Sequence, residues 1–197
     1  MTDPEVLDRI GTSNAEVITQ LKNPCTQDYD EFKNYIHGPE MTWSYHNPMN
    51  FPGDTRELEL PYYHHMIMKR PTEDEAYSTI TSNLFEPAYS VIDEILHFND
   101  IKLSTLYRIH INSTFNSENK KGPWHTDLPF AYKNLIVYMS RFEGGATWVK
   151  YGPPGDEDEL RFLPKEDNAI IFNGKLEHCQ EVPDDYGRRI ILVVNYL

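Results

Sequence analysis

Hydrophobic residues in the second half of the chain recur in short runs separated by glycine, proline and acidic residues. Between residues 101 and 197 these runs are rich in β-branched and aromatic residues, a pattern typical of strands. The predicted strands are LSTLYRIHIN, NLIVYMS, ATWVKYG, ELRFL, NAIIFN and RRIILVVNYL. Short strands punctuated by turns in this way favour a sandwich, a jelly roll or a barrel.

The first half, residues 1 to about 100, has a helical pattern instead. We expect helices from Pro4 to near Gly11, over 14–21 and over 28–36, with Gly38 ending the third. After Asn83 the apolar residues fall at helical spacing, which predicts a core-facing helix that ends near Asp100. These apolar residues are Phe85, Ala88, Ile92, Ile95 and Leu96.

Two possible helix starts have the spacing of a capping box, Asn83 with Glu86 and Thr72 with Glu75. The expected architecture is therefore mainly β with supporting helices (α+β). We expect one domain over residues 1–197, in which a helix and loop region packs on one sheet of the strand region.

Composition narrows the class of protein. Apolar residues make up 39% and charged residues 25%, and the mean hydropathy is −0.61, which is typical of a soluble globular chain. No apolar run reaches the roughly 18–20 residues of a membrane helix, and the start MTDPEVLDRI has no apolar segment of a secretory signal. We therefore expect a cytoplasmic protein with Cys25 and Cys179 as free thiols.

The chain is strongly acidic, with 18 basic and 31 acidic residues and a formal net charge of −13. Proteins that neutralise phosphates carry a basic face, so a nucleic-acid partner is disfavoured. The same charge favours a neutral or basic substrate over a polyanion.

Candidate chemistry begins at His125, because it is the one histidine followed two positions later by an acidic residue, Asp127 in WHTD. Eight histidines and 31 acidic residues produce about one such spacing by chance, so the spacing alone carries little weight. In an extended segment, however, residues two apart point the same way, so both side chains can bind one ion.

His178 offers a third ligand, since it follows the predicted strand NAIIFN and a short turn. Two histidines and one carboxylate form the facial triad of non-haem iron(II) oxygenases. Zinc is the competing metal, but zinc hydrolases with such ligands usually carry HExxH on a helix, and the sequence has no HExxH.

Arg188 and Arg189 open a final strand that is otherwise apolar. A buried arginine needs an anionic partner, and a dicarboxylate cosubstrate bound to the metal would supply one. Neighbouring strand residues face opposite sides, so only one of the two can face the metal. We favour Arg189, which shares a face with Ile191 and Val193, and keep Arg188 as the alternative.

Four segments together resemble the 2-oxoglutarate- and iron(II)-dependent oxygenases, most of all the prolyl-4-hydroxylase-like branch and its small phage-encoded members. The segments are WHTD, NLIVYMSRFEGGATWV, EDNAIIFNGKLEHC and GRRIILVVNYL. The phage-encoded set also has R-I-x-x-N before the H-x-D, here Arg108 to Asn112, and an aromatic stretch like MTWSYHNPMNF. The resemblance is specific over residues 101–197, diffuse over 40–100 and absent before that.

This resemblance implies a double-stranded β-helix and a set of site residues. The implied iron ligands are His125, Asp127 and His178. Arg189 takes the position of the basic residue that holds the distal carboxylate of 2-oxoglutarate. Tyr138 corresponds to a tyrosine bonded to that same carboxylate, although a core tyrosine with a backbone partner is an equal alternative. Asn112 is a further candidate for contacting the cosubstrate.

The resemblance also implies an activity: hydroxylation of an unactivated C–H bond with Fe(II), 2-oxoglutarate and O2, and with succinate and CO2 as co-products. Ascorbate is a candidate auxiliary reductant. The substrate is a small molecule or a peptidyl residue such as proline, and the oligomeric state stays open. Alternatives are a catalytically silent jelly-roll binding protein and a nucleobase-modifying oxygenase. A phage origin would place the enzyme in the cytoplasm of an infected bacterium.

Two further groups lie where a substrate could bind. Trp124 and the segment 128–130 flank the H-x-D, and they are candidates for the mouth of the site or for rim packing. The aromatic cluster Tyr62-Tyr63-His64-His65 is a candidate flap, with packing between helix and sheet as the other interpretation. We expect the N-terminal half or loops to cover the site.

Overall fold

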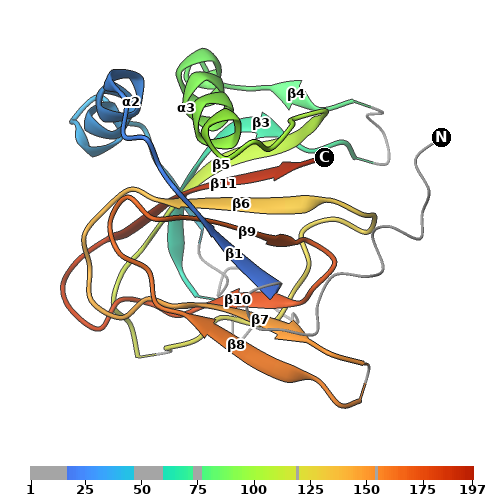
Figure 1. Ribbon diagram of the computed structural model, residues 1–197. Helices are drawn as coiled ribbons and strands as arrows, with labels where there is room; N and C mark the ends of the chain where they lie inside the picture. Colours follow the sequence, from blue (N-terminus) through green and yellow to red (C-terminus); the bar gives the residue numbers. More distant parts are fainter. Residues whose placement is uncertain (1–16, 47–59, 73–76, 119, 154) are drawn as a thin grey trace.

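The computed structural model describes residues 17–46, 60–72, 77–118, 120–153 and 155–197. An eight-stranded antiparallel sheet has the order β1-β9-β6-β11-β5-β3-β2, with β4 paired to β3, and a three-stranded sheet has the order β10-β7-β8. Two helices, α2 and α3, cover one face of the large sheet, and the small sheet lies on the other side (Figure 1).

The element bounds follow the chain. The helices are α2 (Gln27–His37) and α3 (Phe85–Phe98). The large sheet holds β1 (Ile18–Leu21), β2 (Ser44–His46), β3 (Tyr62–Lys69), β4 (Thr79–Ile80), β5 (Leu106–Thr114), β6 (Lys133–Tyr138), β9 (Ala169–Asn173) and β11 (Arg189–Tyr196). The small sheet holds β7 (Thr147–Tyr151), β8 (Asp158–Phe162) and β10 (His178–Gln180).

The central strand β11 is buried on both faces, which explains its apolar sequence. Its residues Ile190, Leu192 and Val194 belong to the core between the large sheet and the helices. Ile191 and Val193 belong to a second core between the two sheets. Because side chains alternate along a strand, the space between the sheets receives every second residue of β11, β5 and β6.

Both helices present apolar faces to the large sheet. In α2, the hydroxyl of Thr26 accepts a hydrogen bond from the backbone of Tyr29, which caps the helix start, and Gly38 ends the helix. Tyr29, Phe32 and Ile36 of α2 are buried with Ala88, Val91, Ile92, Ile95 and Leu96 of α3. The helices therefore support the outer face and leave the inner face free for chemistry.

The expected double-stranded β-helix with helices on one sheet is confirmed, and α2 and α3 lie where the periodicity predicts them. The helix expected over 14–21 is wrong for residues 18–21, which form β1, whereas Val17 is helical. Pairing of Ile18 with Phe172 and of Leu21 with Ala169 buries both ends of β1, and this tertiary pairing outweighs local propensity.

The capping box at Asn83 is also wrong. Leu84 is the N-cap residue of α3 and makes no side-chain capping bond, while Ser82 Oγ accepts a hydrogen bond from the backbone of Leu84. Glu75 of the other proposed box lies outside the described residues, as does the helix expected from Pro4 to near Gly11.

The helix and loop character expected for the first half is wrong for residues 62–69, which form β3 beside β5. Here Ile67 is fully buried in the helix-side core, while Tyr62 lines the space between the sheets. Partial cover on both faces removes the clean alternation that would have predicted a strand. None of the helices in the described ranges is long and apolar enough to cross a membrane.

Candidate metal centre and its cavity

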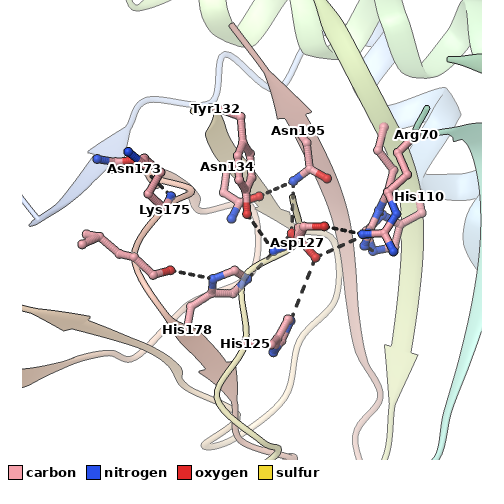
Figure 2. Close-up of polar contacts among 12 residues, drawn as sticks. Arg70, His110, His125, Asp127, Tyr132, Asn134, Asn173, Lys175, His178 and Asn195 are labelled. Carbon is pink, nitrogen blue, oxygen red and sulfur yellow. Dashed lines mark hydrogen bonds and ion pairs between the residues drawn. The ribbon is translucent and has the colours of Figure 1, made fainter. Parts of the chain in front are cut away.

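Three potential metal ligands converge between the two sheets. His125 and His178 lie on adjacent antiparallel segments that exchange two backbone hydrogen bonds, of 3.1 Å and 3.0 Å. Nε2 of His178 lies 3.7 Å from Oδ2 of Asp127, and Nε2 of His125 lies 4.0 Å from Oδ1. All three ligand atoms lie within 4.8 Å of one another, and their side chains point toward a common centre (Figure 2).

The hydrogen bonds of the two rings prepare them to bind a cation. Nδ1 of His125 lies 3.1 Å from the carbonyl oxygen of Pro123, and Nδ1 of His178 lies 3.1 Å from that of Leu176. A carbonyl group only accepts, so each Nδ1 carries the proton and each Nε2 presents its lone pair toward Asp127. Burial and the neighbouring His178 lower the pKa of His125, which favours the neutral ring that a metal requires.

Asp127 is held as an ionised carboxylate. Burial alone raises its pKa, but the nearby His178 ring and the charge of Arg108 hold the pKa well below its ordinary value. Arg108 lies 3.3 Å from Oδ1, and the side-chain amide of Asn195 donates to Oδ2 at 3.1 Å. The backbone N–H of Asp127 donates to the hydroxyl of Tyr132 at 2.8 Å, so the loop itself is also fixed.

Arg108 and Asn195, the two side chains that contact the carboxylate of Asp127 from the large sheet, lie in one row of paired residues across its inner face. Asn195 of β11 pairs in register with Arg108 of β5 on one side and with Asn134 of β6 on the other. The amide of Asn195 also donates to the side-chain oxygen of Asn134. Sequence reasoning missed Asn195 and Asn134 as site residues, although two asparagines inside apolar strands were a usable signal.

Arg189 faces the same space, as strand parity predicts. Its side chain is almost completely buried, with 1% exposed. It donates to the carbonyl of Gly145 at 2.9 Å, to Oε1 of Gln180 at 3.1 Å and to the hydroxyl of Thr147 at 3.0 Å. All three acceptors are neutral, and none of the described carboxylates forms an ion pair with it. A buried guanidinium without a counter-charge is the residue expected at an anion-binding site.

Arg188 points to the other side of the sheet. Its guanidinium lies 5.3 Å from the ring centroid of Trp43 and 5.6 Å from that of Phe115. Of Arg189, the first residue of β11, and Arg188 just before it, only Arg189 lines the cavity described below.

Tyr138 and Asn112 differ in how they meet the site. The hydroxyl of Tyr138 is 2.7 Å from that of Thr147, which in turn accepts from Arg189, so Tyr138 reaches the cavity through Thr147. Asn112 lines the cavity directly, and its side-chain oxygen is buried with no hydrogen-bond partner among the described residues. An unpaired buried amide oxygen is a position where a ligand donor fits.

The triad and Arg189 line one cavity of about 410 Å³. Its remaining wall includes His46, Leu60 and Tyr62, so the N-terminal half contributes to the wall of the site. The further lining residues used below are Arg70, Arg108, His110, Asn112, Thr147 and Gln180.

The residues around the H-x-D pack at its rim. Trp124 lies against Lys121, whose ammonium is 4.3 Å from that ring and 4.1 Å from the ring of Trp148. Leu128 is buried, and Phe130 makes an edge contact with Tyr107. None of these three residues is among the described lining of the cavity, which favours rim packing.

Comparison with known proteins identifies the fold. A 2OG-Fe(II) oxygenase family oxidoreductase from Burkholderia pseudomallei matches with a TM-score of 0.61 and 16% identity, over 85% of this chain and 76% of that one. A prolyl hydroxylase from Trichoplax adhaerens, in complex with a hypoxia inducible factor peptide fragment, matches with a TM-score of 0.56 and 11% identity, over 93% and 84%. No protein-family model and no curated protein matches the chain.

The epimerase SnoN from nogalamycin biosynthesis, in complex with Fe3+, α-ketoglutarate and nogalamycin RO, matches with a TM-score of 0.58 and 10% identity, over 99% and 84%. The chain therefore has the fold of the 2-oxoglutarate-dependent iron oxygenases, the double-stranded β-helix. The finer resemblance to phage-encoded enzymes stays a prediction.

Proposed function

We propose that this protein is an Fe(II)- and 2-oxoglutarate-dependent oxygenase that hydroxylates an unactivated C–H bond. One observation carries the proposal: the cavity holds a two-histidine, one-carboxylate cluster and, from another strand, a buried arginine that lacks a carboxylate partner among the described residues. The first group suits a divalent iron, and the second suits the free end of a dicarboxylate.

The donor set fits this cofactor pair. His125 and His178, with lone pairs on Nε2, and the ionised Asp127 would hold the metal. Arg189 would hold the distal carboxylate of the cosubstrate, with Thr147 and Gln180 fixing the guanidinium. The bound metal supplies dioxygen activation, with succinate and CO2 as co-products and ascorbate as an optional reductant.

The two remaining candidate residues would act at different places in the cavity. Tyr138 orients Thr147 through its hydroxyl, and Asn112 offers an unpaired amide oxygen to a ligand. The apolar side chains of Ile136, Ile191 and Val193 also line the cavity.

The substrate class is a small molecule or a peptidyl residue such as proline. The matched structures include one bound to a peptide and one bound to nogalamycin RO, so the fold accommodates both kinds of ligand. The net charge of −13 argues against nucleic acid and hence against a nucleobase-modifying oxygenase. A catalytically silent binding protein is the competing proposal, and it predicts no turnover of 2-oxoglutarate.

The test is an anaerobic titration with Fe(II) and 2-oxoglutarate, followed by succinate measurement after oxygen is admitted. The wild-type chain should develop a weak visible charge-transfer band and release succinate. His125→Ala and Asp127→Ala should lose both signals, whereas His97→Ala, at an exposed position of α3, should keep both. A wild-type chain that binds Zn(II) but gives neither band nor succinate with Fe(II) would overturn the proposal.

A further inference from the structure

The described lining of the cavity carries more positive charge than Asp127 and the 2-oxoglutarate dianion can neutralise once the metal is bound. The charged residues of the described lining are Arg70, Arg108, Arg189 and Asp127. Fe(II), Asp127 and Arg189 together carry two net positive charges, which the 2-oxoglutarate dianion cancels. Because arginine stays protonated in proteins, the charges of Arg70 and Arg108 remain.

Arg108 is a partly buried cation that is only partly compensated. Its side chain is 16% exposed, and its one ion-pair partner among the described residues is Asp127, which the metal would share. Its Nε and NH2 each lie 2.9 Å from a ring nitrogen of His110. His110 is buried, which together with the nearby Arg108 lowers its pKa well below the ordinary value, so the ring is neutral and adds no counter-charge.

Arg70 is the second cation. It follows β3 directly, is exposed, and donates to the backbone carbonyl of Asp127, a neutral acceptor. Figure 2 shows Arg70 beside His110, on the opposite side of Asp127 from His178. No described carboxylate forms an ion pair with Arg70. The guanidinium of Arg70 therefore contacts the metal-binding loop at the cavity wall. One of its N–H groups donates to that loop, and other N–H groups can donate to a ligand.

We infer that the substrate presents a carboxylate to Arg70 and Arg108. This inference rests on the proposed function and deepens it, because it names the chemical class of the substrate. A guanidinium offers two parallel donors to a carboxylate. The cavity of about 410 Å³ lies near the lower end of the range of ligand pockets, so the substrate portion beside the cosubstrate is of amino-acid size.

The overall charge of −13 does not oppose this local attraction. Salt screens exposed charges beyond about 8–10 Å, so the distant acidic surface contributes little once a ligand enters the cavity. The sequence-based preference for a neutral or basic substrate reflects the average charge of the chain, whereas recognition depends on the two arginines at the wall.

The carboxylate has two possible sources, a free amino or organic acid or a carboxylate of a peptide. The experiment uses the full chain with Fe(II) and saturating 2-oxoglutarate under anaerobic conditions, and it follows the charge-transfer band as probes are added. One arm uses free L-amino acids and their carboxamides. The other uses Gly-Xaa dipeptides with free or amidated C-termini, and acetylated aspartate and glutamate amides against their asparagine and glutamine counterparts.

We expect at least one carboxylate probe to shift the band at a concentration at least tenfold below that of its matched amide. The arm in which this occurs identifies the source. The inference is wrong if no carboxylate probe shifts the band, if an amide acts equally well, or if the active probes merely displace 2-oxoglutarate. Absence of the band without any probe would instead refute the proposed function.

Variants of the exposed Arg70 test whether this arginine binds the carboxylate of the probe. Arg70→Gln should weaken binding of the active probe at least tenfold, and Arg70→Lys, which keeps the charge, should weaken it less. Arg141→Gln removes the same charge from an exposed position outside the described cavity lining and should leave probe binding within twofold of the wild type. Equal losses of probe and 2-oxoglutarate affinity in Arg70→Gln would show that Arg70 only positions the Asp127 loop, and would overturn the inference.

Discussion

Asn195 of the last strand donates a hydrogen bond to Asp127, 68 residues earlier in the chain, with 3.1 Å between Nδ2 and Oδ2. The bond fixes one oxygen of the carboxylate while Arg108 lies near the other. Partners of this kind orient a metal ligand and typically change metal affinity 10–100-fold when removed.

Asn195→Ala should therefore weaken divalent metal binding by about 10–100-fold. The measurement is a titration with Co(II), whose visible spectrum reports binding directly. Asn34→Ala, at an exposed position of α2, serves as the control and should bind Co(II) like the wild type. Because Asn195 is buried, the free energy of unfolding of the metal-free variant is measured in parallel. Unchanged Co(II) affinity in a folded variant would contradict the role of this bond.

Arg189→Ala should raise the concentration of 2-oxoglutarate needed for half-maximal succinate release. Hydrogen bonds to charged groups contribute about 1.5–3 kcal/mol, which corresponds to roughly a 10–100-fold increase. Arg188→Ala removes the same kind of side chain from the position just before β11, where it lies against Trp43 and Phe115, and should change that concentration by less than about threefold. If the two variants exchange these effects, the assignment of Arg189 as the cosubstrate residue is wrong.

Sequence reasoning succeeded where one strand carries a strong pattern. The apolar run of β11 predicted a buried strand, and alternation along it correctly predicted that Arg189 rather than Arg188 faces the cavity. The H-x-D spacing and His178 predicted a cluster that the fold does bring together.

The sequence did not predict features that depend on pairing between strands far apart in the chain. The strand β10 has three residues and is defined by pairing with β7, so its own sequence carries no usable period. Asn195 and Arg108 are neighbours only because β11 and β5 pair in one register, which no single strand encodes. Thr147 and Gln180 reach Arg189 in the same way, through the pairing of β7 with β10.

His110 should make the folded state sensitive to pH in the window just below 6.5. Burial, aided by Arg108, lowers its folded-state pKa well below 6.5, whereas the unfolded chain takes up the proton near 6.5. Stability is therefore complete above pH 6.5 and falls as the pH drops below it, by up to about 1.4 kcal/mol per pH unit from this residue.

The measurement is urea unfolding of the metal-free chain at pH 7.5, 6.5 and 5.5, with His110→Gln as the comparison. The variant should lose less stability between pH 6.5 and 5.5 than the wild type, whatever its stability at pH 7.5. Asp127 does not interfere, because its pKa is lowered: its contribution to stability is present above the unfolded value of 3.8 and is lost only as the pH falls below that value. If the free energy of unfolding changes equally with pH in the two proteins, His110 is not the source of the loss of stability below pH 6.5.

Gly174 leaves room for the ring that supports the metal-binding loop. A Cβ atom at this position would overlap the ring of Tyr132, whose hydroxyl accepts the backbone hydrogen bond of Asp127. The φ angle of Gly174 is not in the left-handed region, so the backbone itself tolerates alanine. Gly174→Ala should therefore act by displacing Tyr132, with a loss of about 1–3 kcal/mol in the free energy of unfolding and weaker Co(II) binding.

A double-mutant cycle separates this mechanism from a general defect at the turn. Tyr132→Ala removes the ring, so adding Gly174→Ala to it should cost much less stability than the same change in the wild type. Tyr132→Phe keeps the overlap partner but removes the hydroxyl, so it should weaken Co(II) binding with a smaller effect on unfolding. Additive losses for Gly174→Ala and Tyr132→Ala would mean that the glycine is needed for something other than space beside this ring.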